Sequence, residues 1–316
     1  MGDKYYREWQ KRKKVKRSPI YRFGMILFGV LIVAISIYIQ SQEEKEEITY
    51  SSAQNGLGFY YYSEVQDNTY YASLNGLEGE ALKEAMHILL NQNFEPTSYG
   101  DAREFLANAD RSIDDPTKVW NIYDGALAPY EWDAVSWHRE HVWPNSRLGL
   151  ERVDNTDKTI ASDLHNLRAV TPAVNSQRGD RFFSDGSGEH QITDDGGFYP
   201  GDEHKGDVAR IIFYMFIMYE ELELRDDNLE DLEAYTPEGA IMGILSVLLE
   251  WHKEDPVSDF ERARNQVIYE YQNNRNPFID KPEYAHLIFE DKTIDDLKPV
   301  ASLSNWLDAW TNWIYG

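Results

Sequence analysis

A run of 20 residues without a charged side chain, from Phe23 to Gln42, constrains this chain more than any other feature. The run is rich in Ile, Leu, Val, Phe and Met, and a helix needs about 20 such residues to cross the hydrocarbon core of a membrane. Lysines and arginines cluster before it, and Glu43 begins an acidic run after it. Because basic flanks stay in the cytoplasm, the pattern predicts a cytoplasmic segment over residues 1–22 and a transmembrane anchor over residues 23–42.

Two other interpretations of this run stay open. A signal peptide would be cleaved and would release the rest of the chain, although no clear small-x-small cleavage site lies near Ser41. A buried core helix is the other alternative, and the asymmetric flanks speak against it. Residues 43–69 are polar and predict a tether, and residues 70–316 predict a single folded domain outside the cytoplasm.

The charge of the chain limits its partners. The formal net charge is -24, and residues 1–23 carry +7, so the remaining residues carry -31. Proteins that bind nucleic acid usually present a basic surface. A polyanionic ligand would therefore need a locally basic groove or the help of metal ions. The chain has no cysteine, which excludes disulfides, thiolate zinc sites and cysteine nucleophiles.

Hydrophobic periodicity predicts a helix-rich α+β domain. Strands are expected over residues 118–123 and 164–170, and a loop over most of residues 183–206. The tail, with Trp306, Trp310 and Trp313, is expected to form a short helix that packs on the domain. Helices are expected over residues 77–90, 102–109, 207–224, 241–251 and 259–273.

A candidate site lies in the middle of this domain. Hydrolysis of a phosphodiester needs a base for water, a hard divalent cation and a cationic side chain that holds the phosphate. Glu140 and His141 are adjacent, and Asn175 follows 34 residues after His141. Pro172 suits the first turn of a helix on which Asn175 and Arg178 share a face. The predicted order is strand, loop, strand and short helix, the layout of a ββα-metal motif.

These residues carry a family resemblance. The chain resembles the bacterial endonuclease I family. Members of this family are extracellular or periplasmic non-specific nucleases of the His-Me finger class. The matching blocks span roughly residues 75–285 and leave the N-terminal anchor and the last residues uncovered. They are 139–144 (REHVWP), 163–167 (DLHNL), 174–178 (VNSQR), 206–210 (GDVAR), 213–215 (FYM), 251–253 (WHK), 255–259 (DPVSD) and 274–280 (NRNPFID).

The resemblance implies a role for four residues. His141 would be the general base, and Glu140 and Asn175 would bind one Mg²⁺ ion, for which Mn²⁺ or Ca²⁺ could substitute. Arg178 would bind phosphate. The implied activity is metal-dependent cleavage of DNA, and of RNA as a further substrate, with little sequence preference. Several periplasmic relatives have disulfides and a cleaved signal, so the absence of cysteine leaves location and substrate access open.

Two further hypotheses concern charge and function. We expect a subset of eight arginines to line a groove for the polyanion, and the alternative is that most of them form structural salt bridges. They are Arg139, Arg168, Arg178, Arg181, Arg210, Arg262, Arg264 and Arg275. The alternative functions are a catalytically idle, membrane-anchored protein that binds nucleic acid or a partner, and a phosphodiesterase or phosphatase acting on a small substrate.

Overall fold

The computed structural model describes residues 53–63, 69–226 and 240–299. Helices and short strands mix in one domain, as the sequence predicted. The helices are α3 (Gly79–Gln92), α4 (Ala102–Ala109), α5 (Pro172–Arg178), α6 (Lys205–Met218), α8 (Leu245–Glu254), α9 (Asp259–Gln272), α10 (Pro277–Asp280) and α11 (Glu283–Phe289). The strands are β1 (Lys118–Trp120), β2 (Leu127–Pro129), β3 (His138–His141), β4 (Leu167–Val170), β5 (Gln191–Ile192), β6 (Phe198–Tyr199), β7 (Leu222–Leu224) and β8 (Ala240–Met242).

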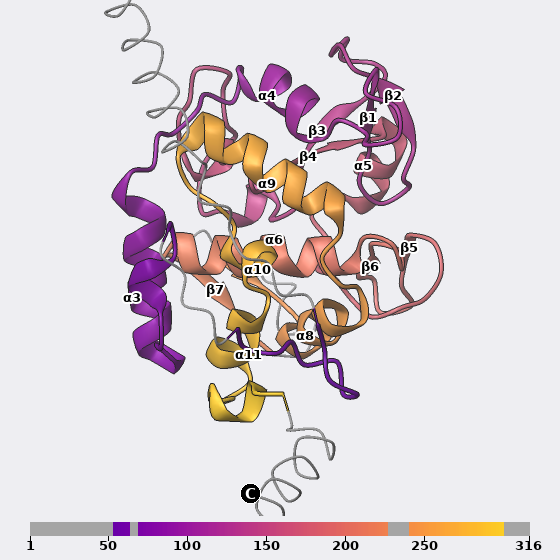
Figure 1. The fold of residues 1–316 in the computed structure, drawn as a ribbon. Helices are drawn as coiled ribbons and strands as arrows, with labels where there is room; N and C mark the ends of the chain where they lie inside the picture. The colour runs from indigo at the N-terminus through magenta and orange to yellow at the C-terminus, as the bar shows by residue number, and fades with distance from the viewer. Residues whose placement is uncertain (1–52, 64–68, 227–239, 300–316) are drawn as a thin grey trace, which may run out of the picture. The chain divides into compact units, whose positions relative to one another are not determined.

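Strands β3 and β4 pair and continue into helix α5 (Figure 1). The pairing is antiparallel, with Glu140 opposite Arg168 and His141 opposite Leu167. Thr171 separates β4 from α5, and Pro172 occupies the first turn of the helix, where its missing N–H costs no hydrogen bond. The strand, loop, strand and helix follow in the order expected from the motif.

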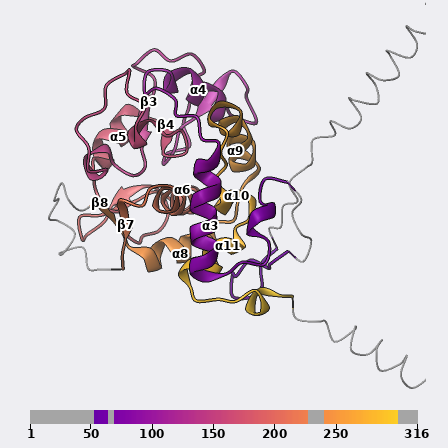
Figure 2. The same ribbon diagram turned by 90° about the vertical axis from the view of Figure 1, so that its left-hand side faces the viewer.

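Helix α6 lies between this β3–β4–α5 unit and helix α8 in both views of the chain (Figures 1 and 2). Most of its side chains are apolar, and all but Lys205 and Phe216 are buried. Asp207, Arg210 and Tyr214 form one polar row on the helix, and each of them pairs with another buried polar group. A helix buried on nearly all sides is stable only when other elements surround it. Helices α3, α8 and α10 pack against α6, so α6 forms the centre of the larger hydrophobic core.

Helix α9 covers a second, smaller core formed with α4 and one face of β4. Alternate residues of a strand point to opposite faces, and Leu167 and Ala169 of β4 pack into this core with Ile268 of α9. Ser258 begins α9 with a capping box, in which its hydroxyl accepts from the Glu261 N–H and the Glu261 carboxylate accepts from the Ser258 N–H. The cap satisfies two backbone donors that the first helical turn leaves free.

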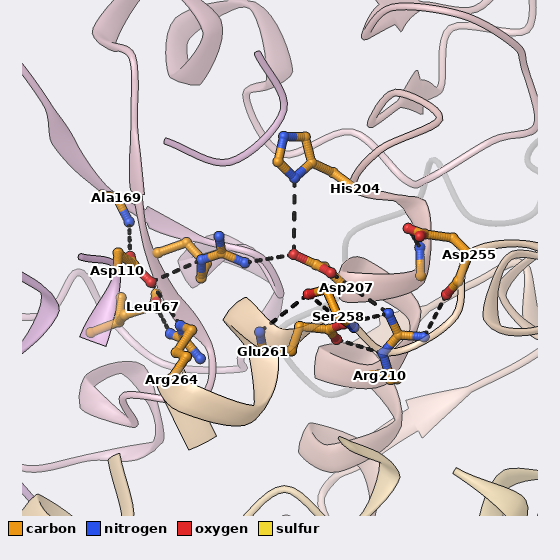
Figure 3. Close-up of polar contacts among 12 residues, drawn as sticks. Asp110, Leu167, Ala169, His204, Asp207, Arg210, Asp255, Ser258, Glu261 and Arg264 are labelled. Carbon is orange, nitrogen blue, oxygen red and sulfur yellow. Dashed lines mark hydrogen bonds and ion pairs between the residues drawn. The ribbon is translucent and has the colours of Figure 1, made fainter. Parts of the chain in front are cut away.

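A chain of buried ion pairs crosses from the small core to α6 (Figure 3). Asp110, which follows α4, lies 2.7 Å from Arg264 and 3.1 Å from Arg168. Arg168 of β4 donates to Asp207 of α6 over 3.1 Å. Beyond Asp207, Arg210 binds Glu261 of α9 through two hydrogen bonds of 2.5 and 2.8 Å. Three arginines thus balance three carboxylates.

Two predicted helices needed correction at their ends. The helix predicted over 207–224 ends at Met218, because Tyr219 turns into an extended conformation and residues 222–224 form β7. The helix predicted from residue 241 begins at Leu245, because residues 240–242 form β8, which pairs in parallel with β7. Both segments form strands because β7 and β8 pair with each other.

The N-terminal boundary of the domain also differs from the prediction. Residues 53–63 were expected in the tether, yet Tyr60 is fully buried and its N–H donates to His286 of α11 over 3.1 Å. The predicted anchor over residues 23–42 and the predicted tail helix lie outside the described residues. Within the described ranges, every helix is too short or too polar to cross a membrane.

The ion chain leads to a prediction about stability. Asp110→Ala leaves the buried Arg264 and Arg168 without this carboxylate and the Ala169 N–H without its acceptor. Breaking a buried pair from one side costs about 3–5 kcal/mol, and we expect a loss of this size in the free energy of unfolding, measured by urea denaturation. Glu80→Ala removes an exposed pair with Lys83 and should cost less than about 1 kcal/mol. Equal losses for the two variants would contradict the prediction.

Candidate active site

His141 ends strand β3 and lines a cavity. Its Nε2 lies 2.8 Å from the carbonyl oxygen of Ala161, and because a carbonyl only accepts, Nε2 carries the proton. Burial, with a smaller contribution from the positive charges of Arg139 and Arg178, lowers the pKa of His141 to about 4, although the hydrogen bond to Ala161 acts in the opposite direction. The ring is therefore neutral at neutral pH, with a free electron pair on Nδ1. Tyr99 stacks on the ring at 5.3 Å between centroids.

Glu140 is almost fully buried, and two side chains contact its Oε1. The Tyr123 hydroxyl donates to Oε1 over 2.9 Å, and Arg178 Nε lies 3.6 Å from the same atom. Burial raises the pKa of Glu140 to about 7, although the Arg178 charge and the Tyr123 hydroxyl act in the opposite direction. No hydrogen bond to Oε2 occurs in the described part of the chain, so this oxygen remains able to bind a ligand.

Helix α5 holds Asn175 and Arg178 in different surroundings. Asn175 is partly exposed and lines the same cavity as Glu140 and His141. Arg178 is fully buried, and its guanidinium donates to the carbonyl oxygens of Val142 over 2.7 Å and of His141 over 3.4 Å. Arg178 does not line the cavity. The phosphate-binding role expected for Arg178 therefore stays a prediction, and the contacts describe a side chain that braces β3 beside Glu140.

Asn166, which directly precedes β4, fixes the chain at the end of β3. Its Oδ1 accepts from the Trp143 N–H over 2.7 Å, and its Nδ2 donates to the Trp143 carbonyl over 3.0 Å. The chain after His141 is thus hydrogen-bonded on one side to Asn166 and on the other to Arg178. Both interactions are fully buried, and they explain how two adjacent strand residues, Glu140 and His141, contact one cavity.

The cavity measures about 1300 Å³ and is open to solvent. Three arginines line it, Arg103, Arg139 and Arg152, together with the carboxylates of Asp154 and Asp180. Of the eight arginines expected in a groove, only Arg139 is among these. Arg168, Arg178, Arg210, Arg264 and Arg275 are buried instead. Most of them bind carboxylates, as the alternative hypothesis of structural salt bridges expected.

The sequence analysis missed several residues of this cavity. Arg103 is on α4, Tyr99 and Trp132 are in loops before β3, and Arg152 is in the connection from β3 to β4. The only available signal was an arginine or aromatic residue near a loop, and this signal has no periodicity and no fixed spacing from the motif.

The donor groups suit a hard divalent cation. Mg²⁺ prefers oxygen ligands, keeps several waters and takes one or two protein groups. Glu140 and Asn175 border one cavity, and the Asn175 side chain makes no hydrogen bond to the described residues. No group of three or more His, Asp or Glu side chains in the described ranges is placed to hold a metal ion, so a site of this kind would take one carboxylate, one amide and water.

Comparison with known proteins gives independent findings. The profile of the family Endonuclease I matches residues 78–283. A protein named extracellular ribonuclease from Bacillus subtilis (strain 168) is 37% identical over 235 residues, which cover 70% of this chain and 78% of that protein. A protein of the same name from Bacillus amyloliquefaciens is 38% identical over 236 residues, with the same shares covered.

Gly100 leads to a prediction about the wall of the cavity. The Tyr99 N–H donates to Asp157 O over 2.9 Å, and the Gly100 N–H donates to Asn155 O over 2.7 Å. A Cβ at residue 100 would lie 2.7 Å from that same Asn155 oxygen. We expect Gly100→Ala to break both bonds and to accelerate hydrogen exchange at these two amides, as measured by NMR.

The matched control for this variant is Gly56→Ala. A Cβ at residue 56 has no atom within 4 Å, so exchange at residues 99 and 100 should not change. Unchanged exchange in Gly100→Ala would show that the segment around Asn155 adapts without losing its contact.

Proposed function

Because the chain belongs to the endonuclease I family, we propose that it is a metal-dependent endonuclease that cleaves DNA and RNA with little sequence preference. One observation carries the proposal: His141, Glu140 and Asn175 border a single cavity. The chemistry of a phosphodiester hydrolase needs a base and a cation at one place. The three side chains come from a strand and a helix that buried contacts hold together.

His141 is the proposed general base. The Ala161 carbonyl fixes the tautomer with the proton on Nε2, which leaves Nδ1 to accept a proton from a water molecule in the cavity. The lowered pKa keeps the ring neutral, so no proton has to leave the ring before it acts. Tyr99 stacks against the ring and limits its rotation.

Glu140 and Asn175 are the proposed ligands of one Mg²⁺ ion, with Mn²⁺ or Ca²⁺ as substitutes. When bound, the ion would screen the phosphate charge and stabilise the leaving oxygen. Tyr123 and Arg178 orient the Glu140 carboxylate through Oε1, so that Oε2 is left for the ion. In this arrangement Arg178 contributes to the reaction by positioning Glu140. To bind phosphate directly, its guanidinium would have to give up its hydrogen bonds to the backbone carbonyls of His141 and Val142.

The proposed location is outside the cytoplasm. The two Bacillus proteins are named extracellular ribonucleases, which favours secretion and makes RNA a substrate to test beside DNA. Whether residues 23–42 remain as a membrane anchor or are cleaved as a signal is a separate prediction. The mass of the protein recovered from membrane and medium fractions distinguishes the two.

A single cleavage assay tests the reaction class, the role of His141 as the base and the need for a metal ion. Purified protein incubated with Mg²⁺ should degrade both supercoiled plasmid and RNA, and a chelator should abolish this degradation. His141→Ala should reduce kcat by about 10²–10⁴-fold, the usual contribution of a general base, while nucleic-acid binding persists. His190→Ala, which changes a histidine away from the cavity, should retain activity. A lack of cleavage by the unmutated protein with any divalent metal would favour the idle binding protein.

A second test concerns the amide ligand. Asn175→Ala should raise the Mg²⁺ concentration for half-maximal cleavage by at least about tenfold, since even outer-shell partners of a metal contribute this much. Asn175→Asp, which retains an oxygen ligand, should restore much of the response. Ser176→Ala removes a neighbouring exposed side chain that donates only to Pro172 O and serves as the control. An unchanged metal titration for Asn175→Ala would remove Asn175 from the site.

A further inference from the structure

Beside His141, the cavity wall consists of alternating aromatic rings and guanidinium groups. The Arg139 guanidinium lies 3.5 Å from the centre of the Tyr99 ring, and the Arg103 guanidinium lies 4.5 Å from the centre of the Trp132 ring. The Arg139 guanidinium also lies 5.9 Å from the centre of the Trp132 ring. All four side chains line the cavity and are partly exposed. We call these four residues the stacking wall.

The stacking wall is continuous with the proposed general base. Tyr99 contacts Arg139 on one side and stacks on His141 with an angle of 23° between the rings. Arg139 also donates to the Tyr99 carbonyl, and Arg103 donates to Asn155 over 2.5 Å. These hydrogen bonds hold the guanidinium groups in fixed orientations, so the planar groups are preformed before any ligand arrives.

Two polar atoms of the stacking wall lack partners within the described residues. The indole Nε1 of Trp132 and the Nε of Arg103 are both buried without a hydrogen-bond acceptor. Both are donors, and a buried donor without an acceptor costs free energy. A ligand with planar faces and acceptor atoms on its edge would satisfy both features of the wall.

We propose that the stacking wall binds an unpaired nucleobase of the substrate, and this inference rests on the proposed nuclease function. Exposed bases of single strands stack on aromatic side chains and on arginine planes, and every base has a face suitable for this contact without regard to sequence. In a duplex the faces of the bases are covered by their neighbours. The wall therefore favours single-stranded nucleic acid over duplex, and Trp132 is a specificity-determining residue.

The experiment measures binding in the presence of a chelator, so that no cleavage occurs. The probes are a fluorescein-labelled single-stranded oligodeoxythymidine and a labelled blunt-ended DNA duplex, compared by anisotropy at one fixed salt concentration. Trp132→Ala should weaken single-strand binding about tenfold, within the range for one base–aromatic stack, and should leave duplex binding nearly unchanged. Trp132→Phe, which retains an aromatic face, should recover most of the loss.

Tyr130→Ala is the matched control, because Tyr130 also lies under an arginine, Arg111 at 4.5 Å, but outside the cavity. It should bind both probes as the unmutated protein does. Equal weakening for both probes in Trp132→Ala, or no weakening, would overturn the proposal. Cleavage assays of the unmutated protein test the nuclease function separately: an active enzyme whose strand preference does not depend on Trp132 would refute only the stacking wall.

Discussion

A chain of buried ion pairs joins β4, α6 and α9, and the position of the proposed catalytic residues depends on it (Figure 3). Arg168, which bridges Asp110 and Asp207, is also the residue paired with Glu140 across the two strands. A buried charge costs free energy unless it has a partner of opposite charge. Displacing β4 relative to α6 would separate these partners, so the arrangement tolerates little displacement. Hydrophobic packing alone would allow the small core and the large core to slide against each other. The ion chain between them specifies one relative position, and Arg264 extends it by donating to the Leu164 and Leu167 carbonyls at the start of β4.

This use of arginine explains how a chain with a net charge of -24 is arranged to meet a polyanion. Most arginines of the sequence motifs neutralise buried carboxylates and contribute little to the field outside the protein. Of the cations that line the cavity, Arg139 belongs to these motifs, whereas Arg103 and Arg152 come from other segments. They are accompanied by Asp154 and Asp180, so the cavity is not strongly basic. A metal ion and contacts to the bases would then supply the attraction that a basic surface supplies in other proteins that bind nucleic acid.

Much of the site could be predicted from sequence because its parts are local. Pro172 at the start of a helix, the spacing from Asn175 to Arg178 and the strand around Glu140 are each set by neighbours along the chain, and the family motif connects them. The burial of Arg178 could not be predicted in this way, because a basic residue beside a catalytic motif has the same sequence signature whether it binds phosphate or a backbone carbonyl. The same reason applies to Arg168 and Arg264, whose partner Asp110 lies far away in the sequence. The end of α6 at Met218 and the start of α8 at Leu245 depend on the parallel pairing of two short strands, β7 and β8. Such a pairing has no local signal in the sequence.

The proposed catalytic residues and the cavity wall have different structural support, and this difference has a functional consequence. Glu140 and His141 are on a strand whose end is hydrogen-bonded to the buried side chains of Asn166 and Arg178. Tyr99, Trp132 and Arg152 are in connecting segments that contact one another through few backbone hydrogen bonds. General-base catalysis requires a position accurate to a fraction of an ångström, whereas stacking on a base tolerates sliding in the plane of the rings. The proposed nuclease with little sequence preference would benefit from this combination, because the reacting phosphate has a constant geometry while the bases beside it change from one substrate to the next.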